Sequence, residues 1–318
     1  MLAIETNGHP AEGEAWIAGG TTLVDLMKLR IYQPRRLVEV YAAHEFMSAI
    51  RETEHGLDLG ALVSMAQAEK DAVVQTKFPA LHLALFLAAS PQIREMATLG
   101  GNLLQKTRCP YYRDRQSPCN KRNPGSGCAA ISGDESHLAI LGTSEHCIAN
   151  YPGDMAVALV ALDAEVTLLA RDGSQRRLPV RDLYRLPETT PHLETTLADG
   201  ELITNIHVPF GQWTGQTYHK VRGRASYAFA IASAAVAVKI RDNTVADVRI
   251  ALGGLAAKPW RCKAAEQALR GQALDVETAL EIGQLCFAES NASAQQAYKV
   301  ELGSCTVARA LLSSVGKA

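Results

Sequence analysis

The sequence lacks any uninterrupted apolar run of the ~18 residues that a membrane-spanning helix needs. It also lacks an excess of charge of one sign, because 32 basic and 33 acidic side chains give a formal net charge of −1. On electrostatic grounds, neither nucleic acid nor an anionic membrane is therefore expected as a partner. Internal repeats and low-complexity segments are absent as well. What is present, 318 residues with 47% hydrophobic side chains, suits two or three globular domains.

The first ten residues have neither the basic start nor the apolar core of a signal peptide. Taken alone, the chain is therefore expected to fold in the cytoplasm, where thiols stay reduced. Seven cysteines in that compartment argue against a disulfide framework and favour metal ligation. No nucleophile–base arrangement or carboxylate pair stands out, so the sequence makes no case for hydrolysis or acyl transfer and contains no candidate catalytic residue.

Two parts of the chain differ in the order of their predicted elements. The first begins with a strand at 15–18, a glycine turn and a helix from residue 23, whose N-cap would be Thr21 or Thr22. A hairpin is expected around Asp172-Gly173. From about 216, strands come first and helices follow, which indicates a separate α+β domain. Its expected strands cover 218–222, 228–240 and 245–253, and its expected helices cover 263–269, 276–287 and 293–312.

Two glycine pairs, Gly19-Gly20 and Gly100-Gly101, each follow a strand-like segment. Paired glycines allow backbone torsions that other residues avoid, and they remove side chains that would hold a ligand away. Consecutive backbone N–H groups at such turns would form an anion site suited to a phosphate. Alternatively, each pair is only a tight connection. Neither pair matches the G-x-G-x-x-G fingerprint, so a Rossmann domain is not supported.

Four cysteines, Cys109, Cys119, Cys128 and Cys147, lie in a segment rich in proline, glycine and arginine. The gaps between them are nine, eight and eighteen residues, and the short C-x₂-C knuckle typical of structural zinc does not occur. Long gaps favour an iron–sulfur cluster wrapped by an irregular loop, and the interleaved basic residues would stabilise its negative charge. A zinc site and unligated thiols remain the alternatives. The other cysteines, Cys262, Cys286 and Cys305, are expected to be buried apolar thiols.

Three motifs together resemble the FAD-binding medium subunit of the xanthine dehydrogenase, or molybdenum hydroxylase, family. They are Ala18-Gly19-Gly20-Thr21, Thr98-Leu99-Gly100-Gly101-Asn102, and Asp154 followed by the apolar run at 158–164. Within that family, the cysteine segment and the motifs at 222–227 and 258–261 most resemble the FAD and [4Fe–4S] subunit of bacterial periplasmic aldehyde oxidoreductases.

The resemblance implies an α+β fold in two domains. A two-subdomain FAD-binding domain of the vanillyl-alcohol-oxidase (PCMH) type would cover 1–210, divided into about 1–56 and 57–210. The cysteine segment, about 105–150, would be an insertion that holds a [4Fe–4S] cluster. A CO dehydrogenase flavoprotein-like C-terminal domain, strands then helices, would cover 216–318. One departure is that 17 residues precede Ala18, where family members usually carry a strand and a helix.

The resemblance also implies which residues bind the cofactors. The first glycine turn would hold the FAD pyrophosphate, Asp154 would bind ribityl or ribose hydroxyls, and Leu202 or Ile203 would lie near the isoalloxazine ring. The alternatives are that Asp154 is merely a helix N-cap and that Lys220 belongs to a solvated basic edge. The cysteines Cys109, Cys119, Cys128 and Cys147 would bind the [4Fe–4S] cluster. The FAD residues would be Ala18, Gly19, Gly20, Thr21, Thr22, Leu23, Thr98, Gly100, Gly101, Asn102, Asp154, Leu202, Ile203 and Lys220.

The implied function is electron transfer in a heterotrimer with a molybdenum-cofactor large subunit and a [2Fe–2S] small subunit. The large subunit would oxidise an aldehyde to a carboxylic acid, and this chain would pass the electrons to an external acceptor. One alternative is the FAD/[4Fe–4S] subunit of a hydroxybenzoyl-CoA reductase-type enzyme, and another is a zinc-stabilised binding module without a redox role. The resemblance favours the periplasm, reached by co-export with a partner, over the cytoplasm.

Overall fold

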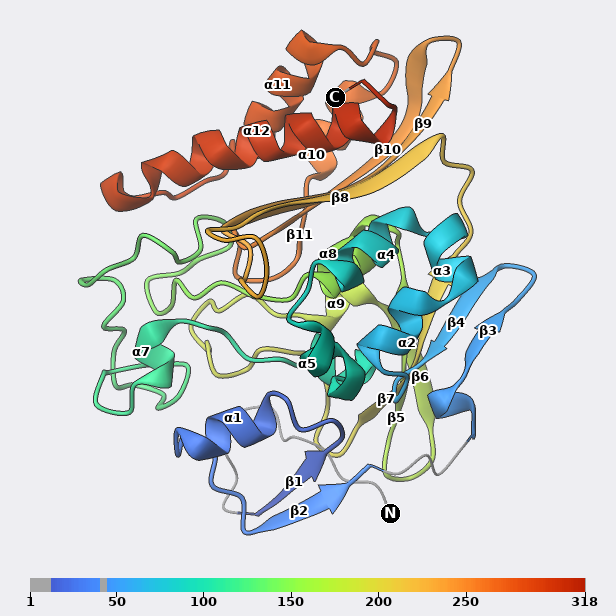
Figure 1. Cartoon of the computed structure of the whole chain (residues 1–318). Coiled ribbons are helices and arrows are strands. Elements are labelled where there is room, and N and C mark those ends of the chain that lie inside the picture. The colour runs from blue at the N-terminus through green and yellow to red at the C-terminus, as the bar shows by residue number, and fades with distance from the viewer. Residues whose placement is uncertain (1–12, 41–44, 318) are drawn as a thin grey trace.

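The computed structural model describes residues 13–40 and 45–317, so the departure expected near the N-terminus lies outside the described residues. The first unit is small (Figure 1). Two parallel strands, β1 (Glu14–Ile17) and β2 (Arg36–Glu39), are connected by the helix α1 (Leu23–Lys28). Leu23 and Leu26 are the buried residues of this helix. The predicted order of strand, glycine turn and helix is confirmed.

The central unit contains a five-stranded antiparallel sheet in the order β3-β4-β7-β5-β6. Its helices pack against the sheet and share one hydrophobic core with it. The predicted hairpin is present, and Gly173 at its turn has a φ of 87°. The strands are β3 (Ile50–Glu52), β4 (Gly56–Gly60), β5 (Glu165–Leu169), β6 (Gln175–Pro179) and β7 (Leu202–Pro209). The helices are α2 (Met65–Lys70), α3 (Ala72–Lys77), α4 (Pro79–Phe86), α5 (Pro91–Met96), α6 (Leu99–Leu103), α8 (Met155–Ala161) and α9 (Val180–Leu183).

The last unit is an antiparallel sheet in the order β11-β10-β9-β8. The helices α10, α11 and α12 cover one of its faces, and α4 and α8 of the central unit pack against the sheet from the other side (Figure 1). Asp242 and Asn243 turn between β9 and β10 with positive φ values of 51° and 60°. The predicted order of strands then helices is confirmed. The elements are β8 (Gly215–Val221), β9 (Ala232–Arg241), β10 (Thr244–Gly253), β11 (Trp260–Arg261), α10 (Lys263–Leu269), α11 (Val276–Leu285) and α12 (Ala297–Ser314).

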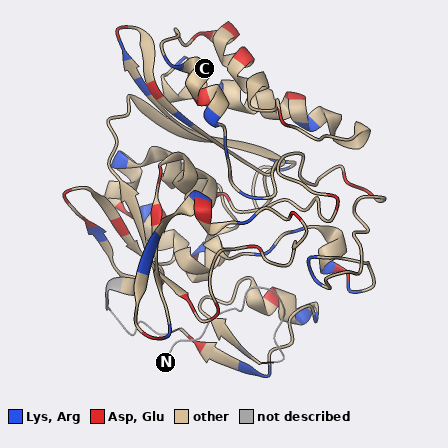
Figure 2. Ribbon diagram, turned by 180° about the vertical axis from the view of Figure 1, so that it is seen from behind, with Lys and Arg blue, Asp and Glu red and all other residues tan. Residues whose placement is uncertain are grey.

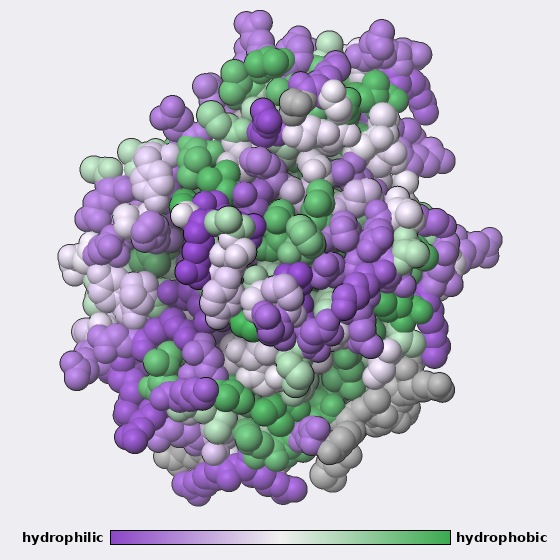
Figure 3. Space-filling model, in the orientation of Figure 1, coloured by the Kyte–Doolittle hydropathy of each residue, from purple (hydrophilic) through white to green (hydrophobic). Residues whose placement is uncertain are grey.

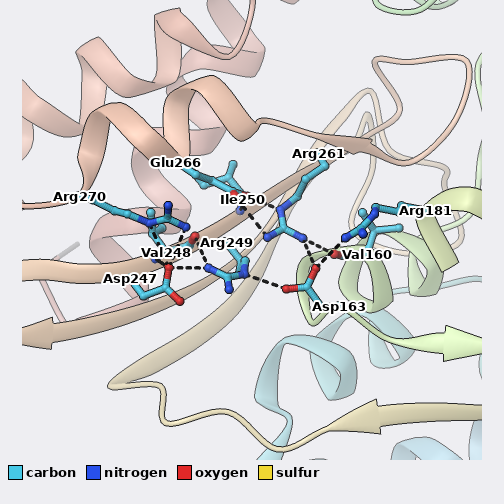
Figure 4. A network of polar contacts seen from close by, with 10 residues as sticks. All are labelled: Val160, Asp163, Arg181, Asp247, Val248, Arg249, Ile250, Arg261, Glu266 and Arg270. Atoms are coloured by element: carbon cyan, nitrogen blue, oxygen red, sulfur yellow. Dashed lines mark hydrogen bonds and ion pairs between the residues drawn. The ribbon is translucent and has the colours of Figure 1, made fainter. Parts of the chain in front are cut away.

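An ion network joins the central and last units at the end of α8 (Figure 4). The Asp163 carboxylate accepts Arg249 Nε at 2.8 Å and Arg261 Nη1 at 2.7 Å, both from the last unit. Arg181 of the central unit lies 3.3 Å from the same carboxylate. Burial opposes ionisation of Asp163, but the two arginines outweigh it and hold the pKa of Asp163 below its usual value. The other charged members of the network are Asp247, Glu266 and Arg270.

The cysteine segment runs along one side of the molecule and contains a single short helix, α7 (Pro110–Arg113) (Figure 1). Its second half is fixed to the last unit. Ile140 N donates to Leu255 O at 2.8 Å, and the buried Lys299 of α12 donates to Leu138 O at 2.6 Å. The irregular loop expected from the sequence is therefore held in part by the last unit.

Acidic and basic residues are interspersed along the described part of the ribbon (Figure 2). Within the described residues, no helix combines the length and apolar character needed to cross a membrane.

Candidate functional site

Two cavities form a trough beside the first glycine turn: the smaller lies between the first and central units, and the larger is also lined by Arg108 and by residues of the last unit. The smaller, about 100 Å³, is lined by both glycine turns, and the larger is about 300 Å³. Thr21 and Thr22 line both cavities, so the two adjoin at this turn. Apolar residues also form a surface around β1 on this face of the molecule (Figure 3). The trough brings together all predicted FAD residues except Lys220, with Asn102 and Asp154 in the larger cavity and the others in the smaller one.

At the first glycine turn the backbone itself requires glycine. Gly20 has a φ of 70°, and a Cβ on Gly19 would lie 1.7 Å from the carbonyl oxygen of Met96. Among the described residues, no hydrogen-bond acceptor is found for the N–H groups of Thr21 to Leu23. Thr22 occupies the predicted N-cap position of α1, but its hydroxyl makes no capping hydrogen bond. The three residues that carry these N–H groups line the smaller cavity, so this turn is suited to bind an anion.

The second glycine turn is different, and the predicted N–H anion site is wrong here. Leu99 N donates to Val63 O and Gly100 N to Ala61 O, each at 2.9 Å. Gly101 N donates to the Thr98 hydroxyl at 3.2 Å, so Thr98 caps α6. A Cβ on Gly100 would lie 2.9 Å from the Ala61 Cβ. This turn therefore uses its glycines and its N–H groups for packing against the segment at 61–63.

Asn102 follows the second turn and carries an unsatisfied buried atom. Its Oδ1 has no hydrogen-bond partner within the described chain, while its Nδ2 lies 3.3 Å from the Met65 sulfur. Buried polar atoms normally have partners. Because Asn102 lines the larger cavity, its Oδ1 is suited to accept a hydrogen bond from a bound molecule.

Asp154 occupies the N-cap position of α8, as the alternative expected, but its side chain makes no capping hydrogen bond. Its carboxylate instead accepts Tyr218 Oη at 2.5 Å and Lys220 Nζ at 2.8 Å. The Lys220 side chain is 1% exposed, so the solvated-edge interpretation is wrong. Burial raises the pKa of Asp154 in spite of these partners. Lys220 lies behind Asp154 and orients it, rather than lining the described cavities.

Sequence reasoning missed three side chains that line the larger cavity: Arg108, Tyr227 and Phe229. Tyr227 and Phe229 are 53% and 44% exposed, and the Arg108 guanidinium lies 4.7 Å from the centre of the Phe229 ring. Tyr227 also has a positive φ of 51°, which is unusual for a bulky residue. The aromatic residues after the basic motif at 222–227 were the available signal.

The four cysteines Cys109, Cys119, Cys128 and Cys147 lie in one apolar cluster with Leu26, Tyr112 and Leu138. Burial, with smaller contributions from neighbouring thiols, raises the pKa of Cys109 to about 11 and also raises the pKa of Cys147. Cys119 and Cys128 form an isolated β-bridge. Within the described chain, no three His, Cys, Asp or Glu side chains are placed to hold a single metal ion.

Most basic residues of the cysteine segment have partners other than the thiols. Arg108 and Arg113 contact Asp25, and Arg122 donates to the carbonyl oxygens of Tyr111 and Tyr112. Lys121 is likewise paired with Glu194, but its charge also acts on Cys147 and lowers the pKa of that thiol against the larger effect of burial. The predicted stabilisation of the cysteines by interleaved cations therefore rests on one lysine rather than on the arginines.

Comparison with known proteins gives two family matches. Residues 6–211 match the FAD binding domain in molybdopterin dehydrogenase, and residues 216–314 match the CO dehydrogenase flavoprotein C-terminal domain. The chain is 43% identical over 300 residues to the aldehyde oxidoreductase FAD-binding subunit PaoB of Escherichia coli, covering 94% of this chain and 91% of that protein. It is 27% identical to the glyceraldehyde dehydrogenase medium chain of Sulfolobus acidocaldarius, covering 86% of this chain and 80% of that protein.

Among solved structures, a chain of the Cu,Mo-CO dehydrogenase matches with a TM-score of 0.73. The match covers 98% of this chain and 92% of that one, at 23% sequence identity. A chain of quinoline 2-oxidoreductase from Pseudomonas putida 86 matches with a TM-score of 0.72 at 20% identity, covering 97% and 91% of the two chains. Both likenesses concern the fold.

Proposed function

The chain belongs to the FAD-binding medium subunits of the molybdenum hydroxylases, and from this premise we propose that it is an electron-transfer subunit of an aldehyde oxidoreductase that carries FAD and a [4Fe–4S] cluster. The substrate class rests on the 43% identity to an aldehyde oxidoreductase subunit. The trough is the observation that supports bound FAD. It is lined by the residues whose N–H groups have no acceptor, by Asn102 with its unpaired Oδ1, and by the buried Asp154.

The N–H groups of Thr21 to Leu23 would hold the pyrophosphate of FAD, which places one end of the cofactor in each cavity. The isoalloxazine ring suits the larger cavity, because Asp154 and Asn102 there can bind ribityl hydroxyls and Tyr227 can lie against the ring. Leu202 and Ile203 line the smaller cavity and would contact the adenosine half, rather than the ring as first expected. Bound FAD would supply a centre that takes up two electrons and releases them singly or in pairs.

In this proposal the residues of the chain position the cofactor. Lys220 and Tyr218 hold the Asp154 carboxylate in one orientation, so that it accepts hydroxyl groups without rearranging. The larger cavity also borders Arg108, the neighbour of Cys109 in the chain. A ring in this cavity would therefore lie on the side of the trough that adjoins the cysteine segment.

The four cysteines lie together in one cluster of side chains, which suits a [4Fe–4S] cluster. Around one zinc ion, four sulfurs at about 2.3 Å from the metal must lie close together, and the described residues contain no such group. In a cubane each thiolate binds a different iron, so the sulfurs are spaced more widely. Backbone N–H groups of Tyr111 and Tyr112 point to the Cys109 sulfur, and Ala149 N lies 3.5 Å from the Cys147 sulfur. Such N–H···S contacts are typical of thiolates that bind iron–sulfur clusters.

We propose the two partner subunits that the family resemblance implies. A large subunit with a molybdenum cofactor would oxidise the aldehyde with water as the oxygen source, releasing two electrons and two protons. A small subunit with [2Fe–2S] centres would connect it to this chain, which would deliver the electrons to an external acceptor. We propose the periplasm as the location, reached by export of the assembled complex. Cell fractionation that finds the complex in the cytoplasm would contradict the location alone.

The proposed cofactors are tested by purifying the chain with its partner subunits. Flavin absorption bands over a broad iron–sulfur absorbance are expected, with about four additional irons per chain beyond those of the small subunit. Replacing Cys119→Ser should remove this cluster and its signal. Cys305→Ser should leave the signal unchanged, because this cysteine of α12 is exposed and not buried as expected. A colourless chain that contains zinc and no iron would contradict the proposal.

A further inference from the structure

A buried ion cluster lies beside Cys147 and outside the flavin trough. Glu194, in the loop between α9 and β7, accepts Lys106 Nζ at 2.7 Å and Lys121 Nζ at 3.0 Å, on different oxygens. Lys121 also donates to Pro191 O at 3.0 Å. The side chains of Lys106, Lys121 and Glu194 are 13%, 11% and 20% exposed. Three charged groups from two loops are thus largely removed from water.

The cluster shares a small cavity with one of the cysteines. A space of about 40 Å³ is lined by Lys106, Lys121, Glu194 and Cys147. Such a space is enough for about one water molecule and too small for a substrate. Lys121 and Cys147 thus border the same small space.

The charges of this ion cluster do not cancel. Burial would keep Glu194 protonated, but Lys106 and Lys121 hold its pKa at about 2, so it is ionised at neutral pH. Two ammonium groups and one carboxylate leave a net charge of +1. Buried ion pairs contribute little to folding stability after their desolvation is counted, and an unbalanced charge contributes less. Stability alone is therefore a poor reason for this arrangement.

We infer that Lys106, Glu194 and Lys121 set the reduction potential of the cluster bound at Cys147, with the lysines raising it and Glu194 lowering it. A bound iron–sulfur cluster gains negative charge when it is reduced, and a nearby buried cation stabilises that charge more strongly than a cation in water would. Lys121 acts directly on Cys147, whereas Lys106 acts through Glu194. This inference rests on the proposed [4Fe–4S] cluster.

The test is a redox titration of the full chain, followed by the electron paramagnetic resonance signal of the reduced cluster. Lys121→Met should lower the ratio of reduced to oxidised cluster at a fixed potential by about tenfold, which is about 59 mV for one electron. Glu194→Gln should raise the ratio, and Lys106→Met should lower it by less than Lys121→Met does. As a control, Glu95→Gln removes the carboxylate of an exposed ion pair with Lys70 and should leave the potential unchanged.

The direction in which each variant shifts the reduction potential distinguishes this role from a purely structural one. If the ions only hold the two loops together, the three variants would lose iron, or their potentials would all shift in one direction or stay at the wild-type value. Any of these results overturns the inference. Should Glu194→Gln fail to fold, the opposite ranking of Lys121→Met and Lys106→Met overturns it equally. A wild-type chain without the cluster signal would refute the proposed function as well. A normal signal with unmoved potentials refutes the tuning role alone.

Discussion

The two glycine turns have nearly the same sequence pattern and different structural roles. The turn at Gly19-Gly20 leaves the N–H groups that follow it without acceptors in the described chain, and they line the trough. The turn at Gly100-Gly101 gives its N–H groups to Ala61, Val63 and Thr98. The neighbouring segment decides the outcome, because the second turn packs on a backbone that offers carbonyl oxygens. A glycine pair before a helix therefore identifies a phosphate site only when nothing else accepts its hydrogen bonds.

The largest effect is expected for Gly19→Ala in the first turn. The new Cβ would meet the Met96 carbonyl oxygen at 1.7 Å, so the first unit must move away from α5. We expect loss of bound FAD and a decrease of about 3 kcal/mol in the free energy of unfolding. Flavin content after gel filtration and denaturant titration measure the two effects. Gly223→Ala is the matched control, since a Cβ there meets nothing within 4 Å. Full flavin content in the Gly19 variant would show that this turn tolerates displacement.

A smaller effect of a different kind is expected for Gly100→Ala in the second turn. The Cβ would press on Ala61 at 2.9 Å, which should cost about 2 kcal/mol of stability. FAD should still bind, because the N–H groups of this turn do not face the cofactor. Adding Ala61→Gly should restore part of the stability by removing the opposing methyl group. Loss of FAD without loss of stability would mean that the second turn, not the first, contacts the phosphates.

The smallest effects are expected for the two threonines at the N-cap positions, Thr22 before α1 and Thr98 before α6. Thr98→Val removes the cap on Gly101 N and should lower the stability of the FAD-free chain by about 1 kcal/mol. Thr22→Val removes no capping bond, so the stability of the FAD-free chain should stay within about 0.5 kcal/mol of the wild type. Thermal unfolding of the FAD-free proteins measures both. Equal losses in the two variants would contradict the difference between the turns.

The sequence was sufficient to predict the positions of the helices and strands that have clear local signals. The β5–β6 hairpin and α10 lie where they were predicted, since a turn signal and a helical period are local properties. The helices α3, α5 and α7 were missed, because four to six residues are too few to show a period. The equally short α1 was predicted from the glycine turn and the threonines before it.

The sequence predicted which residues form the site. It did not predict the hydrogen-bond partners of those residues. Asp154 is held by Tyr218 and Lys220, which are 64 and 66 residues away in the chain. Ala61 and Val63 accept the hydrogen bonds of the second turn. Neither residue is part of a phosphate-binding motif, so the sequence did not indicate this role. Such pairings depend on how the units pack, and a single sequence carries no local sign of them.

The central claim is that the first turn, and not the second, supplies backbone N–H groups to the cofactor. Amide hydrogen exchange resolved to single residues, with and without FAD, tests it directly. The N–H groups of Thr21 to Leu23 should exchange rapidly without FAD and slow by at least about tenfold when it binds, because only then do they gain acceptors. Those of Leu99 to Gly101 should be protected in both states. Rapid exchange at Leu99 to Gly101 without FAD, and protection there when FAD binds, would contradict the account.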